Sequence, residues 1–191
     1  RYDYSYDHAG RLVSTRYNLF SNYIDFQRNT YDELGRLAST TPLGLSDQTT
    51  TYAYDIQSRM TSLKQKHFGE ELTYTLSGNI SKQTFLDGGS YTFAYDLLSR
   101  LTQADYADGM ANRSCSFSYD KNGNLLSLKR FAGSFSETIN MSYGGDRMYQ
   151  TTQRADFDDG YTFKRYADNK KEYEYNTNGS LISAVNRGIS S

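Results

Sequence analysis

Aspartates recur along this chain in a pattern that raises the question of carboxylate chemistry. Six of them directly follow a tyrosine, and five of these recur in a longer repeated motif, namely Asp7, Asp32, Asp55, Asp96 and Asp120. Most glycoside hydrolases use two carboxylates that flank a sugar ring as acid and as base or nucleophile. A catalytic pair of that kind is needed once, whereas here the same carboxylate returns in unit after unit. The recurrence indicates a turn that each unit requires, so we expect no catalytic role for these residues.

The other groups suited to catalysis or metal binding are few. His8 and His67 are the two histidines, and neither has a serine or cysteine partner at a spacing typical of a catalytic triad. The acidic run at 156–160 resembles a calcium loop only loosely, because such a loop has glycine at its sixth position and glutamate at its twelfth. Here glycine is fifth and Ala167 is twelfth. We therefore expect no catalytic residue, no metal site and no cofactor.

The aspartates belong to a repeated motif, Tyr-Asp-x-x-Gly-Arg-Leu. Two copies are complete, at Tyr6–Leu12 and at Tyr31–Leu37, and others are degenerate, with Ser58 and Ser99 in the glycine position. The repeat tyrosines are at positions 6, 31, 54, 74, 95, 119, 143 and 175. A period in the twenties is typical of a stacked supersecondary unit rather than of independent domains. The residues to which we assign a structural role in the repeat are Tyr6, Asp7, Gly10, Arg11, Tyr31, Asp32, Gly35, Arg36, Tyr54, Asp55, Arg59, Tyr95, Asp96, Arg100, Tyr119, Asp120, Gly123, Tyr175 and Gly179.

Each unit has the features of a β-hairpin. The aspartate can accept backbone N–H bonds and so start a tight turn, and the glycine supplies the left-handed conformation that closes it. The arginine is expected to contact a neighbouring aspartate or a turn carbonyl. An aromatic or apolar residue lies two positions before the repeat tyrosine, on the same face of a strand, and Asn29 is the exception. Further turns fall midway between repeats, for example at Asp108-Gly109.

Two strands and two turns in each unit predict an all-β fold of consecutive antiparallel hairpins. We expect about sixteen strands in one strongly twisted or spiralling sheet, and essentially no helix. The mean hydropathy of −0.77 argues against a thick apolar core. The 19 tyrosines and 10 phenylalanines suit a single sheet, which cross-strand aromatic pairs can stabilise by roughly 0.2–1 kcal/mol each.

Charge and cysteine content exclude several classes of protein. The net charge is −1 and the pI is about 6.2, so there is no basic footprint for nucleic acid. The single cysteine, Cys115, rules out an internal disulfide framework, and its neighbours suggest an ordinary strand residue. No apolar run approaches the ~20 residues of a membrane-spanning helix.

The repeat resembles that of the Rhs/YD-repeat family, which includes bacterial Rhs polymorphic toxins, shell-forming subunits of insecticidal toxin complexes, and animal teneurins. The resemblance extends from Tyr4 to Leu181. It implies that residues 1–191 form a single array of about eight repeats, a fragment of a longer protein and an arc of a hollow shell. It further implies a bacterial, exported protein at the cell surface or outside the cell, whose partners are adjacent repeats and an enclosed C-terminal domain. The chain has no Asp-Pro dipeptide, so the self-cleavage of toxin-type members cannot be assigned to any residue.

The function that this resemblance favours is a non-enzymatic scaffold that encloses or presents a cargo or toxin domain. The alternative is a carbohydrate-binding or adhesive segment, because tyrosine and phenylalanine rings repeated on one sheet face can stack on sugar rings. The same rings also suffice to hold hairpin to hairpin without a ligand. We expect no enzymatic activity.

Overall fold

The computed structural model describes residues 1–19, 22–42, 44–110, 112–133, 135–145, 147–155, 169–177, 180–184 and 189–190. Within them lie seventeen β-strands and one three-residue 3-10 helix, Ser46–Gln48, and no α-helix. The predicted all-β class of consecutive antiparallel hairpins is therefore confirmed. The acidic run at 156–160 and Gly179 lie outside the described residues.

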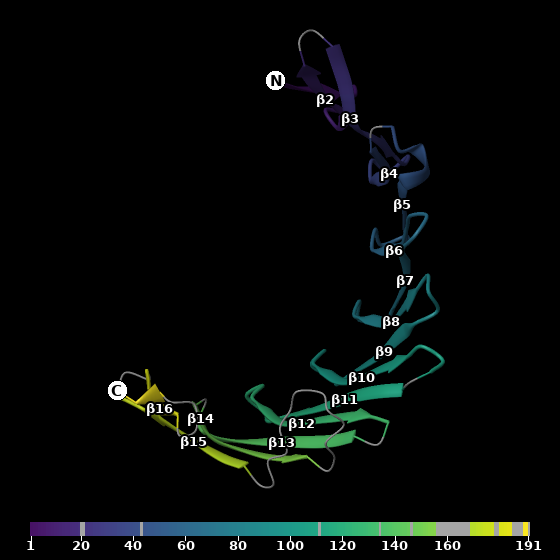
Figure 1. Ribbon diagram of the computed structural model, residues 1–191. Coiled ribbons are helices and arrows are strands. Elements are labelled where there is room, and N and C mark those ends of the chain that lie inside the picture. The colour runs from purple at the N-terminus through teal and green to yellow at the C-terminus, as the bar shows by residue number, and fades with distance from the viewer. Residues whose placement is uncertain are drawn as a thin grey trace. The chain divides into compact units, whose positions relative to one another are not determined.

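The chain forms two compact units, Arg1–Gly89 and Ser90–Ser191. In the first unit each strand pairs antiparallel with the next along the chain. Its strands are β1 (Tyr2–Tyr6), β2 (Leu12–Leu19), β3 (Asn22–Tyr31), β4 (Leu37–Pro42), β5 (Thr50–Tyr54), β6 (Met60–Lys64), β7 (Gly69–Tyr74) and β8 (Ile80–Phe85). Figure 1 shows these strands as one layer, with no second layer packed on it.

The second unit repeats this arrangement, again with each strand paired to the next. Its strands are β9 (Ser90–Tyr95), β10 (Leu101–Ala107), β11 (Asn112–Tyr119), β12 (Leu125–Ala132), β13 (Phe135–Gly144), β14 (Arg147–Ala155), β15 (Asn169–Tyr175), β16 (Leu181–Ala184) and β17 (Ile189–Ser190). The ladder register shifts at the repeat tyrosine, as at Tyr119 and Tyr143, where the outgoing strand has an extra residue. Such a bulge follows from a turn that ends on a left-handed residue.

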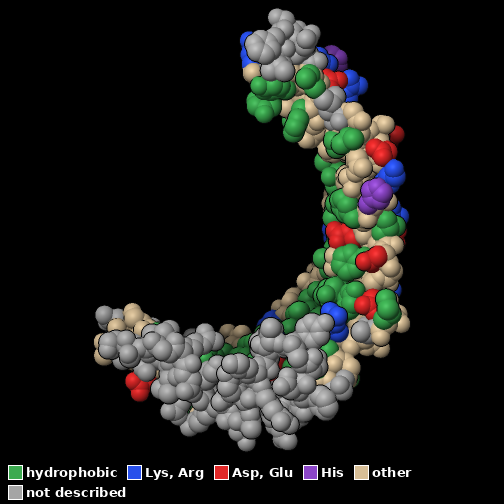
Figure 2. All heavy atoms as spheres, in the orientation of Figure 1, with side chains coloured by type: hydrophobic (Ala, Val, Ile, Leu, Met, Phe, Trp, Pro, Cys, Tyr) green, Lys and Arg blue, Asp and Glu red, His purple; other side chains and the backbone are tan. Residues whose placement is uncertain are grey.

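The two faces of the sheet differ in chemistry, because side chains alternate along each strand. On one face, hydroxyl groups pair across neighbouring strands, with Oγ–Oγ distances of 2.7 Å for Ser5 and Ser14 and 2.9 Å from Thr73 Oγ1 to Ser81 Oγ. The other face holds the tyrosines and leucines, and Figure 2 shows hydrophobic side chains along one border of the first unit and charged ones along the opposite border. Leu72 is the buried apolar side chain among the described residues. A single layer leaves most rings half-exposed, which agrees with the low hydropathy.

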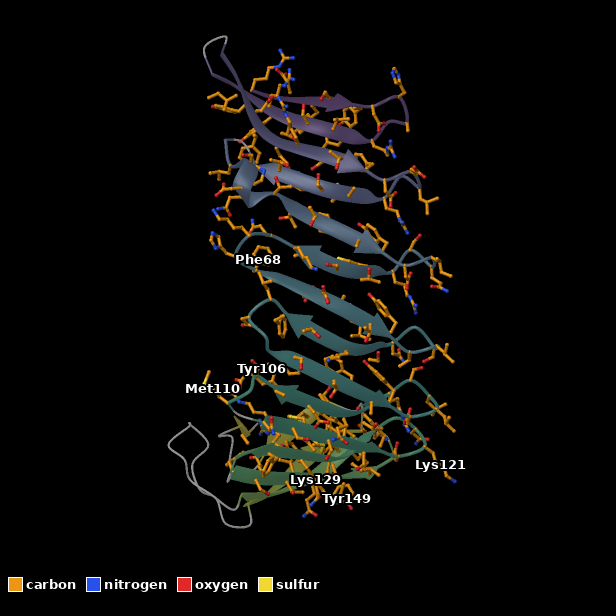
Figure 3. The ribbon with its side chains drawn as sticks, turned by 90° about the vertical axis from the view of Figure 1, so that its right-hand side faces the viewer. Phe68, Tyr106, Met110, Lys121, Lys129 and Tyr149 are labelled. Carbon is orange, nitrogen blue, oxygen red and sulfur yellow. The ribbon has the colours of Figure 1, made fainter. Side chains whose placement is uncertain are left out.

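The repeat turns join neighbouring strands on one side of the sheet, and the intermediate turns join them on the opposite side. In the second unit, Figure 3 shows Lys121 at the tip of a repeat turn and Met110 at the opposite edge. Side chains at the turn tips point into solvent even when they are apolar: Ile56 is 92% exposed and Leu76 is fully exposed. The tip positions therefore carry no packing constraint, which explains why their residue types vary from repeat to repeat.

Candidate functional site

The repeat aspartate closes its own turn. In the turn after β9, one carboxylate oxygen of Asp96, Oδ1, accepts backbone N–H groups from Leu98 at 2.9 Å and Arg100 at 3.0 Å. The other oxygen, Oδ2, accepts Nε–H of Arg100 at 2.7 Å. The backbone N–H of Arg100 is the largest influence that lowers the pKa of Asp96, against partial burial, which raises it. The carboxylate is thus held in its charged form by the turn that it organises.

The repeat arginine reaches from its own turn to the next hairpin. The guanidinium carbon of Arg100 lies 4.8 Å from the centre of the Tyr119 ring. Its Nη1 donates to the backbone carbonyl of Asp120, at the start of the next turn, at 2.7 Å. The hydroxyl of Tyr119 donates back to the carbonyl of Leu101 at 2.8 Å. We call this set of contacts the Asp–Arg–Tyr link: one aspartate and one arginine in a turn, and the repeat tyrosine of the following hairpin.

The same link recurs three times in the first unit. The arginine-to-ring distances are 4.6 Å for Arg11 and Tyr31, 4.7 Å for Arg36 and Tyr54, and 4.4 Å for Arg59 and Tyr74. In each case the tyrosine hydroxyl donates to a carbonyl of the preceding hairpin, at Leu12, Leu37 and Met60 respectively. A cation held over an aromatic face contributes ~0.5–1 kcal/mol at an exposed site. Where the arginine is present, the repeat motif therefore couples a hairpin to its successor as well as closing its own turn.

Three of the described repeat turns, at Thr75, Asp120 and Asn176, close without an arginine. At Asp120, the side-chain amide of Asn124 donates to Oδ2 at 2.9 Å, where the other turns have Nε of an arginine. At the turn after β7, the hydroxyl of Thr75 accepts the backbone N–H of Asn79 at 3.1 Å. Asparagine is too short to reach the next hairpin. These turns therefore keep the contacts that close the turn, but they have no arginine that could contact the tyrosine of the next hairpin.

Serine replaces glycine in two turns without changing the backbone. Ser58 and Ser99 have φ angles of 62° and 60°, in the left-handed region where Gly10 and Gly35 lie. Left-handed backbone is strained for a residue with a Cβ. At Ser58 the hydroxyl accepts a bond from Nη1 of Arg36 at 3.2 Å.

The remaining residues of the repeat lie at strand ends or in the turns that follow them. Tyr6 ends β1 and is 61% exposed. Tyr95 ends β9 and Tyr175 ends β15, while Gly123 has a φ of 91° in the Asp120 turn. Asn29, the exception in the apolar column, is buried: its amide donates to the carbonyl of Leu12 at 3.1 Å, and its oxygen accepts from the Gln27 side chain at 2.9 Å.

The stacking of arginine on the next tyrosine was not predicted from the sequence, although a signal for it exists. Where the motif arginine is present, a repeat tyrosine follows 15 to 20 residues later, at Tyr31, Tyr54, Tyr74 and Tyr119. From the sequence the arginine is expected to contact a neighbouring aspartate or a turn carbonyl, and both contacts occur at Arg100. The contact with the next tyrosine depends on strand lengths, which the motif alone does not fix.

The groups considered for catalysis are placed as turn residues. His8 and His67 are exposed on turns at opposite edges of the sheet. In the described part of the chain, no three His, Cys, Asp or Glu side chains form a cluster that could hold a metal ion. No helix among the described residues is long and apolar enough to cross a membrane.

Comparison with known proteins agrees with this geometry. The family model "Teneurin YD-shell" matches residues 56–191, and the model "RHS Repeat" matches residues 31–65. The chain belongs to the teneurin YD-shell family. No curated protein matches it.

Solved structures show the same fold at low sequence identity. The crystal structure of TcdB2-TccC3-TEV is 15% identical to this chain, with a TM-score of 0.58 over 96% of the chain. The crystal structure of TcdB2-TccC3-Cdc42 is 16% identical, with a TM-score of 0.59 over the whole chain. The chain spans 12% of the length of each of those chains. This likeness establishes the YD-shell fold for residues 1–191.

Proposed function

We propose that this chain is a wall segment of an exported bacterial YD shell, a non-enzymatic scaffold that encloses or presents a cargo or toxin domain. The observation that carries the proposal is the Asp–Arg–Tyr link, in which an arginine contacts the repeat tyrosine of the next hairpin and the tyrosine hydroxyl donates back, in four places. A motif whose residues bind the next hairpin extends the sheet, and an extended sheet is suited to form the wall of a shell. The repeat aspartates and arginines are engaged in that role, so they are not available to a substrate.

Limited proteolysis of the full-length parent protein tests the enclosure. A wall held by the links should shield the segment C-terminal to the repeats from trypsin. Replacing Arg36, Arg59 and Arg100 together with asparagine should loosen the wall and raise the cleavage rate of that segment. Lys121→Gln, at an exposed turn tip, is the matched control. A segment that is cleaved equally fast in the wild-type protein and as a free polypeptide would refute the proposal.

Carbohydrate binding is the second candidate, and the three tyrosines of β1 are the observation in its favour. Tyr2, Tyr4 and Tyr6 alternate along one strand and present exposed rings on one face. Glycan-array screening separates the two functions. Saturable binding that Tyr4→Ala abolishes would support an adhesive segment, whereas a wall segment should bind no glycan saturably.

A further inference from the structure

A hollow of about 270 Å³ lies on the aromatic face of the second unit, near the edge that carries the intermediate turns. It arises from the pattern of side-chain sizes in two cross-strand columns. The outer column is Tyr91, Tyr106, Arg113, Ala132 and Phe135, and the inner column is Phe93, Ala104, Cys115, Arg130 and Glu137. Ala104, Cys115 and Ala132 are small, so they form a depressed floor between large neighbours.

The walls of this groove are aromatic. The rings of Tyr91 and Tyr106 lie 4.7 Å apart between centres at an angle of 46°, and Phe135 borders the other side. Figure 3 places Tyr106 near Met110, on the side of the sheet that carries the intermediate turns. The surface that faces the hollow is mostly apolar, whereas a sugar needs many hydrogen-bonding groups. The chemistry of the walls therefore suits a flat apolar ring.

The groove is also lined by Arg113, which contacts no carboxylate within the described part of the chain. Eight of the nine arginine side chains that the structure describes contact a carboxylate: Arg1, Arg11, Arg16, Arg28, Arg36, Arg59, Arg100 and Arg130. Arg113 is the ninth, and among the described residues its guanidinium contacts the Tyr106 ring, at 5.8 Å, and no carboxylate.

The two arginines of the groove differ in this respect. Arg130 pairs with Glu137, whose side chain is 1% exposed and lies directly opposite on β13. That pair is neutral as a unit, so the charge of Arg113 remains. Arg113 is exposed, so a ligand can reach its guanidinium, and the planar fork of that group matches both oxygens of a carboxylate.

We propose that this groove binds an aromatic carboxylate, with the ring between Tyr106 and Phe135 over the small-residue floor and the carboxylate on Arg113. The proposal goes beyond the wall function and does not depend on it. Two sources share this chemistry: a free small acid, and the last residue of a polypeptide that ends in phenylalanine or tyrosine. A ligand of about eleven non-hydrogen atoms should bind in the millimolar range.

The single cysteine gives a local readout. Cys115 is half-buried in the floor, so a bound ring should slow its alkylation by iodoacetamide, which mass spectrometry measures. The small-acid arm compares 3-phenylpropionate with its neutral amide. The polypeptide arm compares a peptide that ends in a free phenylalanine carboxylate with the same peptide amidated. The carboxylate form should protect Cys115 in a saturable way at concentrations where the amide does not.

Variants separate the charge from the shape. Arg113→Gln should weaken carboxylate binding roughly tenfold or more, as expected for loss of a charge-assisted hydrogen bond. Ala132→Leu should fill the hollow and abolish protection by both forms. Lys129→Gln is the control, because Lys129 pairs with Ser116 on the opposite face and should leave protection unchanged.

The wild-type protein alone can overturn the proposal, even if a variant does not fold. Equal protection by carboxylate and amide would show that Arg113 selects no anion, and absence of protection by every probe up to about 50 mM, roughly tenfold above the expected millimolar range, would show that the groove binds no such ring. If either the small acid or the peptide protects Cys115 and the other does not, the protecting probe identifies the source of the ligand.

Discussion

Two consecutive turns of the second unit, at Asp96 and at Asp120, differ in one position of the motif. Both aspartates accept two backbone N–H groups and one side-chain donor. The donor is Arg100 in the first turn and Asn124 in the second, and the Arg100 side chain also extends to the next hairpin, to the Tyr119 ring and to the carbonyl of Asp120. Closing a turn and joining two hairpins are therefore separate tasks, carried by the aspartate and the arginine.

The largest expected effect comes from acid, which acts on both turns. The pKa of Asp96 is lowered below 3.8, chiefly by the backbone N–H of Arg100, and that of Asp120 chiefly by the amide of Asn124. A lowered folded-state pKa means that the stabilisation is present above 3.8 and lost as the pH falls through the folded value. Unfolding monitored by circular dichroism should therefore set in below about pH 4. A stability that is flat from pH 6 to pH 2 would contradict this role.

Arg100→Asn should convert the first turn into a copy of the second. The turn should still close, since asparagine can donate to Asp96 as Asn124 does to Asp120. The contacts with Tyr119 and the carbonyl of Asp120 should be lost, at a cost of roughly 1–2 kcal/mol. Urea unfolding measures the change, with Lys121→Gln as the control at an exposed tip. An unchanged midpoint would mean that the forward contacts contribute nothing.

Asn124→Arg should make the reverse conversion. The new guanidinium can keep the bond to Asp120 and extend toward Tyr143, the repeat tyrosine of the following hairpin. The expected gain is about 0.5–1 kcal/mol, because it adds a cation over an aromatic ring at a partly exposed site. Combined with Arg100→Asn, it moves the link by one hairpin. A lower urea midpoint for Asn124→Arg, with the turn still closed, would contradict the separate roles assigned to the aspartate and the arginine.

Ser99→Gly should have the smallest effect, since it changes the turn and leaves the link alone. Glycine relieves the left-handed strain of φ 60° but loses more backbone entropy on folding, so the net gain should be below about 1 kcal/mol. Ser58→Gly should gain less, because it also removes the acceptor for Arg36. Thermal unfolding of the two variants side by side checks the order.

The hairpins, the turns and the all-β class could be predicted from the sequence because they depend on local chemistry. The aspartate, the left-handed position and the alternation of apolar residues each act within one hairpin. The contact between the arginine and the next repeat tyrosine joins residues 15 to 20 positions apart. Predicting that contact requires the lengths of the strands between them, which the motif does not give.

The surroundings of Asn29 and Cys115 depend on the register between strands, which the sequence alone does not give. Asn29 was the exception in an apolar column, and the structure buries it beside Tyr31, where both side chains donate to the carbonyl of Leu12. Cys115 was interpreted as an ordinary strand residue. It is one, but its position opposite Ala104 and Arg130 makes it the floor of a groove, which no single strand reveals.

Within each unit, every described strand pairs with its neighbour along the chain, and this has a consequence for how the unit folds. All ladders join segments close in sequence, and even the arginine contacts span 15 to 20 residues. Sheets usually fold slowly because distant segments must meet before any contact compensates for the lost chain entropy. Here each new hairpin only has to add to the edge of the one before it. The rate should therefore depend little on the number of repeats, and the sheet can grow from its N-terminal hairpins while synthesis of the chain continues.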